Sequence, residues 1–188
     1  APINPTGGLD SSSDTGNGNA GTSSDNKTNL SRPILSGLAE NGAKVEVTLG
    51  GVTYTTTADS STGAWSVAIG TGGKDANGNA TPQTLSSGSY TPSIVVTDRA
   101  GNAAAAVSGT AFTVDTVAPT LTITSDKSVL KAGETATITF TFSEAPVGFT
   151  SDDVSVTGGT LSGLAVSQQN PKVYTATFTS TAATSTVS

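Results

Sequence analysis

Short runs in which apolar and polar residues alternate recur along the chain, and they restrict it to β-structure. In Lys44–Leu49 every second residue is valine or leucine, which is the period of a strand with one buried face. The run ends at Gly50–Gly51, a pair typical of a two-residue hairpin turn. Similar runs and turn signals follow at a spacing of roughly ten residues, and no segment has a helical period. The pattern therefore predicts an all-β fold built as a β-sandwich.

The expected strands cover most of the chain after residue 33. Trp65 shares one face of its run with Val67 and Ile69, so we expect it at the centre of the core. Tyr90 begins a later strand, and we expect it to hold the preceding corner. The expected strands are Ile34–Leu38, Lys44–Leu49, Val52–Thr57, Ala64–Ile69, Tyr90–Thr97, Ala103–Val114, Leu121–Ile123, Thr135–Phe142, Val154–Val156, Gly163–Val166 and Val173–Phe178.

An Ala-Pro pair stands at residues 1–2 and again at residues 118–119, which indicates a chain organised as a repeat array. We therefore expect two tandem units, residues 1–116 and 117–188. The Thr-Asp-Arg-Ala-Gly-Asn sequence at Thr97–Asn102 has no counterpart in the second unit. We expect this unit to be incomplete, either truncated or split at its C-terminal end.

The first 29 residues differ from the rest of the chain. They contain almost no apolar side chains and are dominated by glycine, serine, asparagine and aspartate. Such a composition is typical of a disordered linker. Apart from its carboxylates, nothing in this long N-terminal segment favours an ordered structure.

Composition removes most catalytic chemistry. The chain has no histidine and no cysteine, so a Ser-His-Asp triad, a cysteine nucleophile and a zinc site with thiolate or imidazole ligands are all excluded. Carboxylate pairs alone are compatible with glycoside hydrolysis. We do not expect an enzyme.

The net charge of −6 at pH 7 disfavours nucleic acid and anionic membrane surfaces as partners, and it favours cations. No apolar run approaches the length that spans a bilayer, so we expect no membrane insertion in this segment. The absence of cysteine also means that disulfide bonds do not stabilise the fold.

Several motifs in order resemble one family. Thr97–Asn102, Val114–Pro119 and Leu9–Gly16 look like the bacterial Ig-like repeats of large adhesins exported by type I secretion, the RTX and biofilm-associated adhesins. Residues 127–146, which include Phe142–Pro146, resemble a second subtype of the same repeat. The resemblance implies tandem Ig-like β-sandwiches in an elongated extracellular rod at the bacterial cell surface. It also implies calcium ions at the domain joints, and a ligand-binding tip that the rod holds away from the cell.

The partners implied by the resemblance are the neighbouring Ig-like repeats of the same chain. A host or surface ligand would be bound by other domains. We expect the segment to be a monomer.

Calcium prefers six to eight oxygen ligands from carboxylates, amides and carbonyls. The N-terminal segment offers Asp10, Asp14 and Asp25. If the sandwich is Ig-like, the hairpin at Asp98 lies at the same end, and these four carboxylates converge on one site. The alternative is a solvated acidic linker, with Asp98 only shaping a turn.

A second calcium site is expected at the joint between the units. Glu40, Asp115 and Asp75 are placed at the opposite end of the first unit, facing the second, which contributes Asp153. Alternatively, Glu40 and Asp115 are ordinary turn and linker residues.

We therefore expect a structural segment that extends and presents an adhesin. Two other functions remain open. The chain is a split Ig-like scaffold that carries an inserted ligand-binding domain, or it is a module that binds a glycan or a surface polymer through the long loop at residues 70–89.

Overall fold

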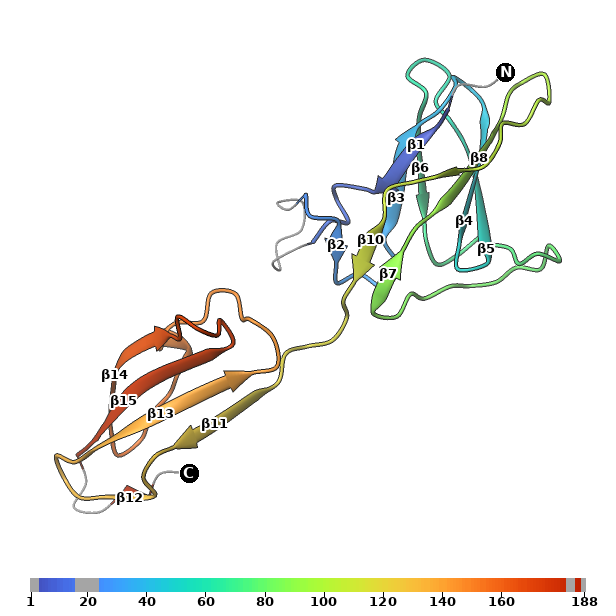
Figure 1. Ribbon diagram of the computed structural model, residues 1–188. Helices are drawn as coiled ribbons and strands as arrows, with labels where there is room; N and C mark the ends of the chain where they lie inside the picture. The colour runs from blue at the N-terminus through green and yellow to red at the C-terminus, as the bar shows by residue number, and fades with distance from the viewer. Residues whose placement is uncertain (1–3, 16–23, 182–184, 187–188) are drawn as a thin grey trace. The chain divides into compact units, whose positions relative to one another are not determined.

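The computed structural model describes residues 4–15, 24–181 and 185–186 of the 188-residue chain. The chain folds as two compact units, Ala1–Val117 and Ala118–Ser188. Both are built from strands (Figure 1), and the one helical element in the described ranges is a short 3-10 turn, η2 (Ser151–Asp153).

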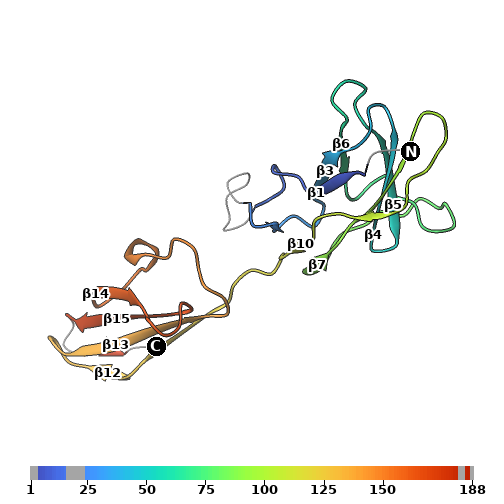
Figure 2. The same ribbon diagram turned by 45° about the horizontal axis from the view of Figure 1, so that its top comes forward.

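Unit 1 contains three sheets, with the strand orders β1-β3-β6, β5-β4-β8-β9 and β2-β10-β7. Most neighbouring strands are antiparallel, and the exception is the pair β2 and β10. Figure 2 shows the same strands from a second direction. The strands are β1 (Thr6–Leu9), β2 (Lys27–Thr28), β3 (Ile34–Leu38), β4 (Lys44–Leu49), β5 (Val52–Thr57), β6 (Ala64–Ala68), β7 (Gly88–Tyr90), β8 (Ser93–Thr97), β9 (Val107–Ser108) and β10 (Phe112–Val114).

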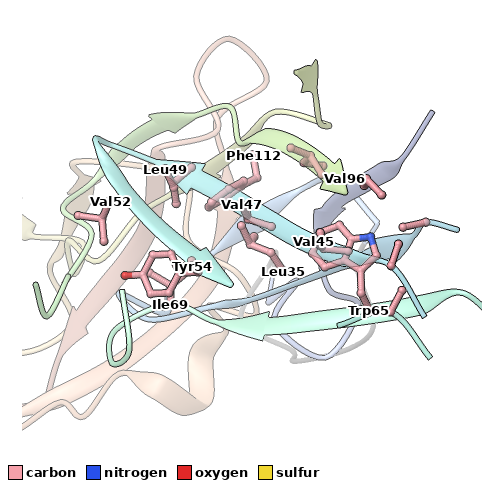
Figure 3. Close-up of a cluster of buried hydrophobic side chains, with 14 of the residues drawn as sticks. Leu35, Val45, Val47, Leu49, Val52, Tyr54, Trp65, Ile69, Val96 and Phe112 are labelled. Atoms are coloured by element: carbon pink, nitrogen blue, oxygen red, sulfur yellow. The ribbon is translucent and has the colours of Figure 1, made fainter. Parts of the chain in front are cut away.

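The core of unit 1 is one cluster of apolar side chains contributed by all three sheets (Figure 3). The alternation in β4 has the expected effect, because Val45, Val47 and Leu49 are buried while the residues between them are partly exposed. Trp65 lies in the same cluster and is 4% exposed, as expected. The Tyr90 hydroxyl donates to the Ser86 carbonyl at 2.9 Å, so Tyr90 does hold its corner.

Strand β1 forms inside the segment that was expected to be a linker. It pairs antiparallel with β3, and Gly7 stands opposite Gly37. A Cβ atom on Gly7 would overlap the Trp65 ring, so glycine allows β1 to lie directly against the tryptophan. The expectation of disorder was wrong for residues 6–9, while residues 1–3 and 16–23 lie outside the described residues.

Two expected strands of unit 1 are shorter than the pattern indicated. The run from Tyr90 to Thr97 is divided into β7 and β8 at Pro92, which has no N–H group for a sheet. The run from residue 103 to residue 114 contains only β9 and β10. The glycine at Gly109 packs against Gly7 and Pro92 at the point where that run breaks.

Unit 2 contains a four-stranded antiparallel sheet with the order β11-β13-β15-β14. Its second layer includes the pair β12 and β16, which has only two residues in each strand. The segment at residues 154–156 was expected to be a strand and is not one. The strands are β11 (Leu121–Ser125), β12 (Val129–Leu130), β13 (Thr135–Phe142), β14 (Gly159–Val166), β15 (Val173–Ser180) and β16 (Ser185–Thr186).

The core of unit 2 lies on one face of this sheet. Ile138 and Phe140 of β13 are buried beside Phe178 of β15. Phe149, from the loop before η2, makes edge-on contacts with Phe140 and with the ring of Tyr174. Other apolar side chains of the same unit stay exposed, among them Leu121 and Ile123 of the outer strand β11.

Candidate metal centre

Asp14 is the most buried acidic side chain of the candidate set. It follows β1 in a tight turn, where its N–H donates to the Asp10 carbonyl at 3.0 Å. The residue is 5% exposed. Its Oδ2 accepts a hydrogen bond from the Asn26 N–H at 3.0 Å. Its Oδ1 is buried and has no hydrogen-bond partner among the residues that the structure describes.

A buried carboxylate oxygen without a partner is costly, because it has lost its water and gained nothing in return. A cation beside Oδ1 would remove that cost. Among the residues that the structure describes, Asp14 is the candidate carboxylate with an oxygen in this position, and a calcium ion there stays a prediction.

The segment that follows brings a second carboxylate close to Asp14. Asn26, which donates to Asp14, has a φ of 59°, in the left-handed region that asparagine tolerates better than most residues. Asp25 directly precedes it, and its Oδ1 accepts from the Lys27 N–H at 3.1 Å. The Lys27 ammonium lies 3.6 Å from the other Asp25 oxygen.

Asp115 is held at the same end of unit 1. Its N–H donates to the Thr28 carbonyl at 2.8 Å, which continues the parallel pairing of β2 with β10. Its Oδ1 accepts from the N–H of Val117 at 3.1 Å. The structure therefore places Asp14, Asp25 and Asp115 on neighbouring segments.

No group of three or more acidic side chains in the described part of the chain is arranged to hold a metal ion by itself. A cation at Asp14 would need further oxygen ligands. Calcium accepts backbone carbonyls and neutral side-chain oxygens as well as carboxylates. The buried Thr15 and Thr28 hydroxyls, 3.5 Å apart, belong to the same region.

The expected grouping of the carboxylates was wrong in two respects. Asp98 follows Thr97, which pairs with Lys44 at the start of β4. Asp98 therefore lies at the end of unit 1 where the turn that begins at Glu40 leads into β4. Asp115 instead lies at the Asp14 end. Glu40 follows the Leu38 end of β3, whereas Asp115 is joined through Thr28 to the segments near the Ile34 end, so the length of β3 separates the two residues.

The carboxylates of Asp98 and Asp75 each accept hydrogen bonds from residues of the turn that they begin, and the pattern of hydrogen bonds is the same in both turns. In each, aspartate Oδ1 accepts from the N–H groups two and four residues later, at 2.8 to 2.9 Å. Aspartate Oδ2 accepts from the amide of the asparagine four residues later, Asn79 or Asn102. Both turns read Asp-x-x-Gly-Asn, a repeat that could have revealed the role of these asparagines from the sequence.

These hydrogen bonds favour the ionised aspartates. The Asn102 amide, followed by the Asn102 N–H, lowers the pKa of Asp98. The Asn79 N–H, followed by its amide, lowers the pKa of Asp75. The Ser61 hydroxyl lowers the pKa of Asp59 in a third turn, and the Ser12 hydroxyl lowers the pKa of Asp10.

The remaining candidates also have local roles. Asp153 Oδ2 accepts from the N–H of Thr150 at 2.8 Å and so caps η2. Glu40 begins the turn into β4, where its carbonyl accepts from the Ala43 N–H. A cation at Asp10, Asp75, Asp98 or Asp153 would share its carboxylate with the donors of that turn. Their role as calcium ligands stays a prediction.

Two family models match the chain. One covers residues 2–116 and the other residues 115–188, and both describe a bacterial Ig-like domain. The chain belongs to the bacterial Ig-like domain family. The predicted all-β fold with Ig-like sandwiches is confirmed. A comparison with curated proteins finds no match.

Bacterial Ig-like domains are generally structural modules without catalytic activity, and they are typically found in surface or extracellular proteins. Within the ranges that the structure describes, no helix is long and apolar enough to cross a membrane. The matches place one Ig-like domain after another along this chain, as expected for a repeat.

Proposed function

We propose that this chain is an extender segment of a bacterial cell-surface adhesin, stiffened by calcium at the ends of its Ig-like domains. The tandem family matches support a repeat with a structural role. The chain has no histidine and no cysteine with which to build the common nucleophilic sites. Other domains of the adhesin would bind the host or surface ligand, and neighbouring repeats would be the direct partners of this segment.

The observation that carries the calcium part of the proposal is Oδ1 of Asp14, which has no hydrogen-bond partner among the described residues. It is buried at the end of unit 1 from which β10 leads to the linker. Asp25 and Asp115 lie on the adjacent segments and supply further negative charge. Calcium bound there would neutralise like charges beside the linker and restrict its bending.

Calcium would also stabilise the fold, because it binds the folded chain and not the unfolded one. At a hundredfold excess over the dissociation constant, the gain is about 2.7 kcal/mol. The adhesin assignment itself rests on the resemblance of the Thr97–Asn102 and Leu9–Gly16 motifs to repeats of that class.

The test is small-angle X-ray scattering of the full chain together with a thermal melt, in millimolar calcium and then in excess chelator. We expect chelation to increase the flexibility of the particle and to lower the melting temperature. An unchanged scattering profile and an unchanged melt would remove calcium from the proposal. A plain Ig-like spacer would then remain.

A further inference from the structure

Strand β1, the first strand of unit 1 that the structure describes, is held with little side-chain burial. It lies at the edge of its sheet and has β3 as its neighbour there (Figure 1). Leu9 is its one apolar side chain and is partly buried against the core. At its other edge, one backbone hydrogen bond among the described residues reaches it, from the N–H of Thr110 to the Gly7 carbonyl at 2.8 Å. The strand therefore makes few of the contacts that hold unit 1 together.

Strand β1 nevertheless covers one edge of the Trp65 indole ring. Gly7 lies so close to the ring atoms Cζ2 and Cη2 that a Cβ atom at this position would overlap them. One ring atom separates Cζ2 from Nε1, the nitrogen drawn in blue in Figure 3. This nitrogen is buried, and its N–H has no hydrogen-bond partner among the described residues. A buried donor without a partner costs free energy, and this cost disappears when β1 moves away and water reaches the N–H.

Two of the four residues of β1 are glycines, and the close approach depends on them. A Cβ atom on Gly8 would meet the Thr110 side chain, and one on Gly37, which faces Gly7, would overlap the Thr6 carbonyl. Glycine loses more conformational freedom on folding than any other residue. The chain entropy that Gly7 and Gly8 regain on release therefore opposes the closed position of β1.

The chain is fixed more firmly directly after β1. The N–H of Asp10 donates to the Ile34 carbonyl at 3.0 Å. The N–H of Ile34 donates to Ser13 Oγ at 2.8 Å, and Ser13 is buried. The turn from Asp10 to Ser13 thus occupies both backbone groups of Ile34, so movement of β1 ends at this turn.

We propose that β1 is a strap that opens locally about Asp10 while the rest of unit 1 stays folded. Local opening requires the least free energy where few apolar contacts are buried. Strand β4, by contrast, is paired on both sides and buries three apolar side chains, Val45, Val47 and Leu49.

The open state exposes one edge of the Trp65 indole. It also frees the backbone groups of β3 that bond to β1, while β3 stays paired with β6. A free strand edge is a surface to which an extended peptide can pair. The strap therefore controls access to an aromatic side chain and to a strand edge, both of which are covered in the closed state.

The first experiment is native-state hydrogen exchange of the full chain, followed by NMR in excess chelator so that calcium has no influence. Trp65 is the only tryptophan and gives one indole N–H signal. The N–H of Gly8 is the second reporter, because bonding alternates along an antiparallel pair and the Asp10 N–H is bonded to β3.

We expect both reporters to exchange at least about a hundredfold faster than the slowest N–H groups of β4. Their exchange should also be nearly independent of low denaturant concentrations, because local opening exposes little surface. The exchange of the β4 groups should accelerate with denaturant, since these groups exchange through global unfolding.

The second experiment closes the strap with a disulfide, which is possible because the chain has no cysteine. Thr6 faces Leu38, and both residues are exposed. The Cα atoms of such a pair lie about 5.5 Å apart, within disulfide reach. Oxidation of the double variant Thr6→Cys, Leu38→Cys should slow the indole exchange at least about tenfold more than the exchange of β4, and reduction should restore it.

The matched control is the double variant Lys44→Cys, Thr57→Cys, which joins β4 to β5 and leaves β1 free. Its oxidation should not slow the indole exchange relative to that of β4. Circular dichroism melts verify that each variant is folded.

Reporters that exchange as slowly as β4, or whose exchange accelerates as steeply with denaturant, would mean that β1 opens only on global unfolding. The proposal is then overturned. It is also overturned if the two disulfides slow the indole exchange equally, relative to β4.

Discussion

Asp14 is a carboxylate whose two oxygens have different environments. Oδ2 is satisfied by Asn26, whereas the buried Oδ1 has no partner in the described residues. In the absence of a cation, this oxygen opposes folding, because its desolvation is not compensated. Once a cation binds to this oxygen, the interaction stabilises the folded state.

The variant Asp14→Asn separates these effects, because it removes the charge and keeps the shape. At saturating calcium we expect the wild-type chain to gain about 2–3 kcal/mol over the chelated state, and the variant to gain less than half of that. The readout is the melt of unit 1 with and without calcium. The exposed Asp152→Asn in unit 2 is the control and should keep the full gain; an equal gain in the Asp14 variant would contradict the assignment.

The turn carboxylates predict how unit 1 responds to acid. Hydrogen bonds hold the pKa of Asp59, Asp75 and Asp98 below the ordinary value of 3.8. The unfolded chain therefore binds protons at a higher pH than the folded chain does. Their contribution to stability is complete above pH 3.8 and is lost as the pH falls below it.

We expect the melting temperature of unit 1 in chelator to fall between about pH 5 and about pH 2.5. The variant Asp98→Asn should have a lower melting temperature at pH 5, and its melting temperature should fall less over this range, because the variant lacks one of these three carboxyls. A variant with the same slope as the wild type would show that the Asp98 turn does not contribute. The exposed Asp152→Asn again serves as a control.

At the scale of single elements, β1 depends on two facing glycines. Gly7 pairs with Gly37 and lies against the Trp65 ring. The variant Gly7→Ala forces β1 away from the tryptophan, and we expect a loss of about 1–3 kcal/mol, the usual cost of an oversized side chain in a packed site. The measurement is denaturant unfolding followed by Trp65 fluorescence.

Ser66→Ala on strand β6 of the same sheet is the control for this variant. Ser66 is exposed, and its replacement should change the stability by no more than about 0.5 kcal/mol. If Gly7→Ala unfolds at the same denaturant concentration as the wild type, then β1 does not pack on Trp65 in solution.

The strands with a clear alternation were predictable from the sequence with correct bounds. Strands β4, β5 and β13 each combine a period of two with a turn signal at one end, and β3 is a short run that ends at the turn signal after Ala39. Strand β1 was not predictable, because Thr6–Leu9 contains two glycines and little apolar surface. It forms because its partner β3 and the ring of Trp65 are available, and that information is nonlocal.

The candidate site was predictable in its residue types and not in its geometry. The sequence indicated the aspartates of the N-terminal segment as candidates, but it did not indicate that Asp14 would be the buried one. Which end of the sandwich each carboxylate occupies depends on strand direction. The parallel pairing of β2 with β10 moves Asp115 to the Asp14 end, and local spacing contains no signal for a parallel contact of two residues.

At the scale of the whole molecule, the two units can be observed separately. Trp65 is the only tryptophan of the chain and belongs to the core of unit 1. Tryptophan fluorescence therefore reports the unfolding of unit 1, whereas far-ultraviolet circular dichroism reports both units. Phe140 is 2% exposed in the core of unit 2.

We expect Phe140→Ala to destabilise unit 2 by about 3–5 kcal/mol. The dichroism melt should then show an earlier first transition while the fluorescence transition stays in place. Leu35→Ala, in the core of unit 1, should instead lower the temperature of the fluorescence transition and leave the unfolding transition of unit 2 in place. If Phe140→Ala moved the fluorescence transition by the same amount, the units would unfold as one.

The chain enters and leaves unit 1 at opposite ends of its strands, and this has a mechanical consequence. The chain enters β1 at the Leu38 end of β3, and it leaves after Asp115, which is tied through Thr28 to the segment at the Ile34 end. A pulling force on the chain thus acts along the strands of unit 1. Their hydrogen bonds lie across the direction of that force, so they share the load and must break together, which makes the domain resistant to tension.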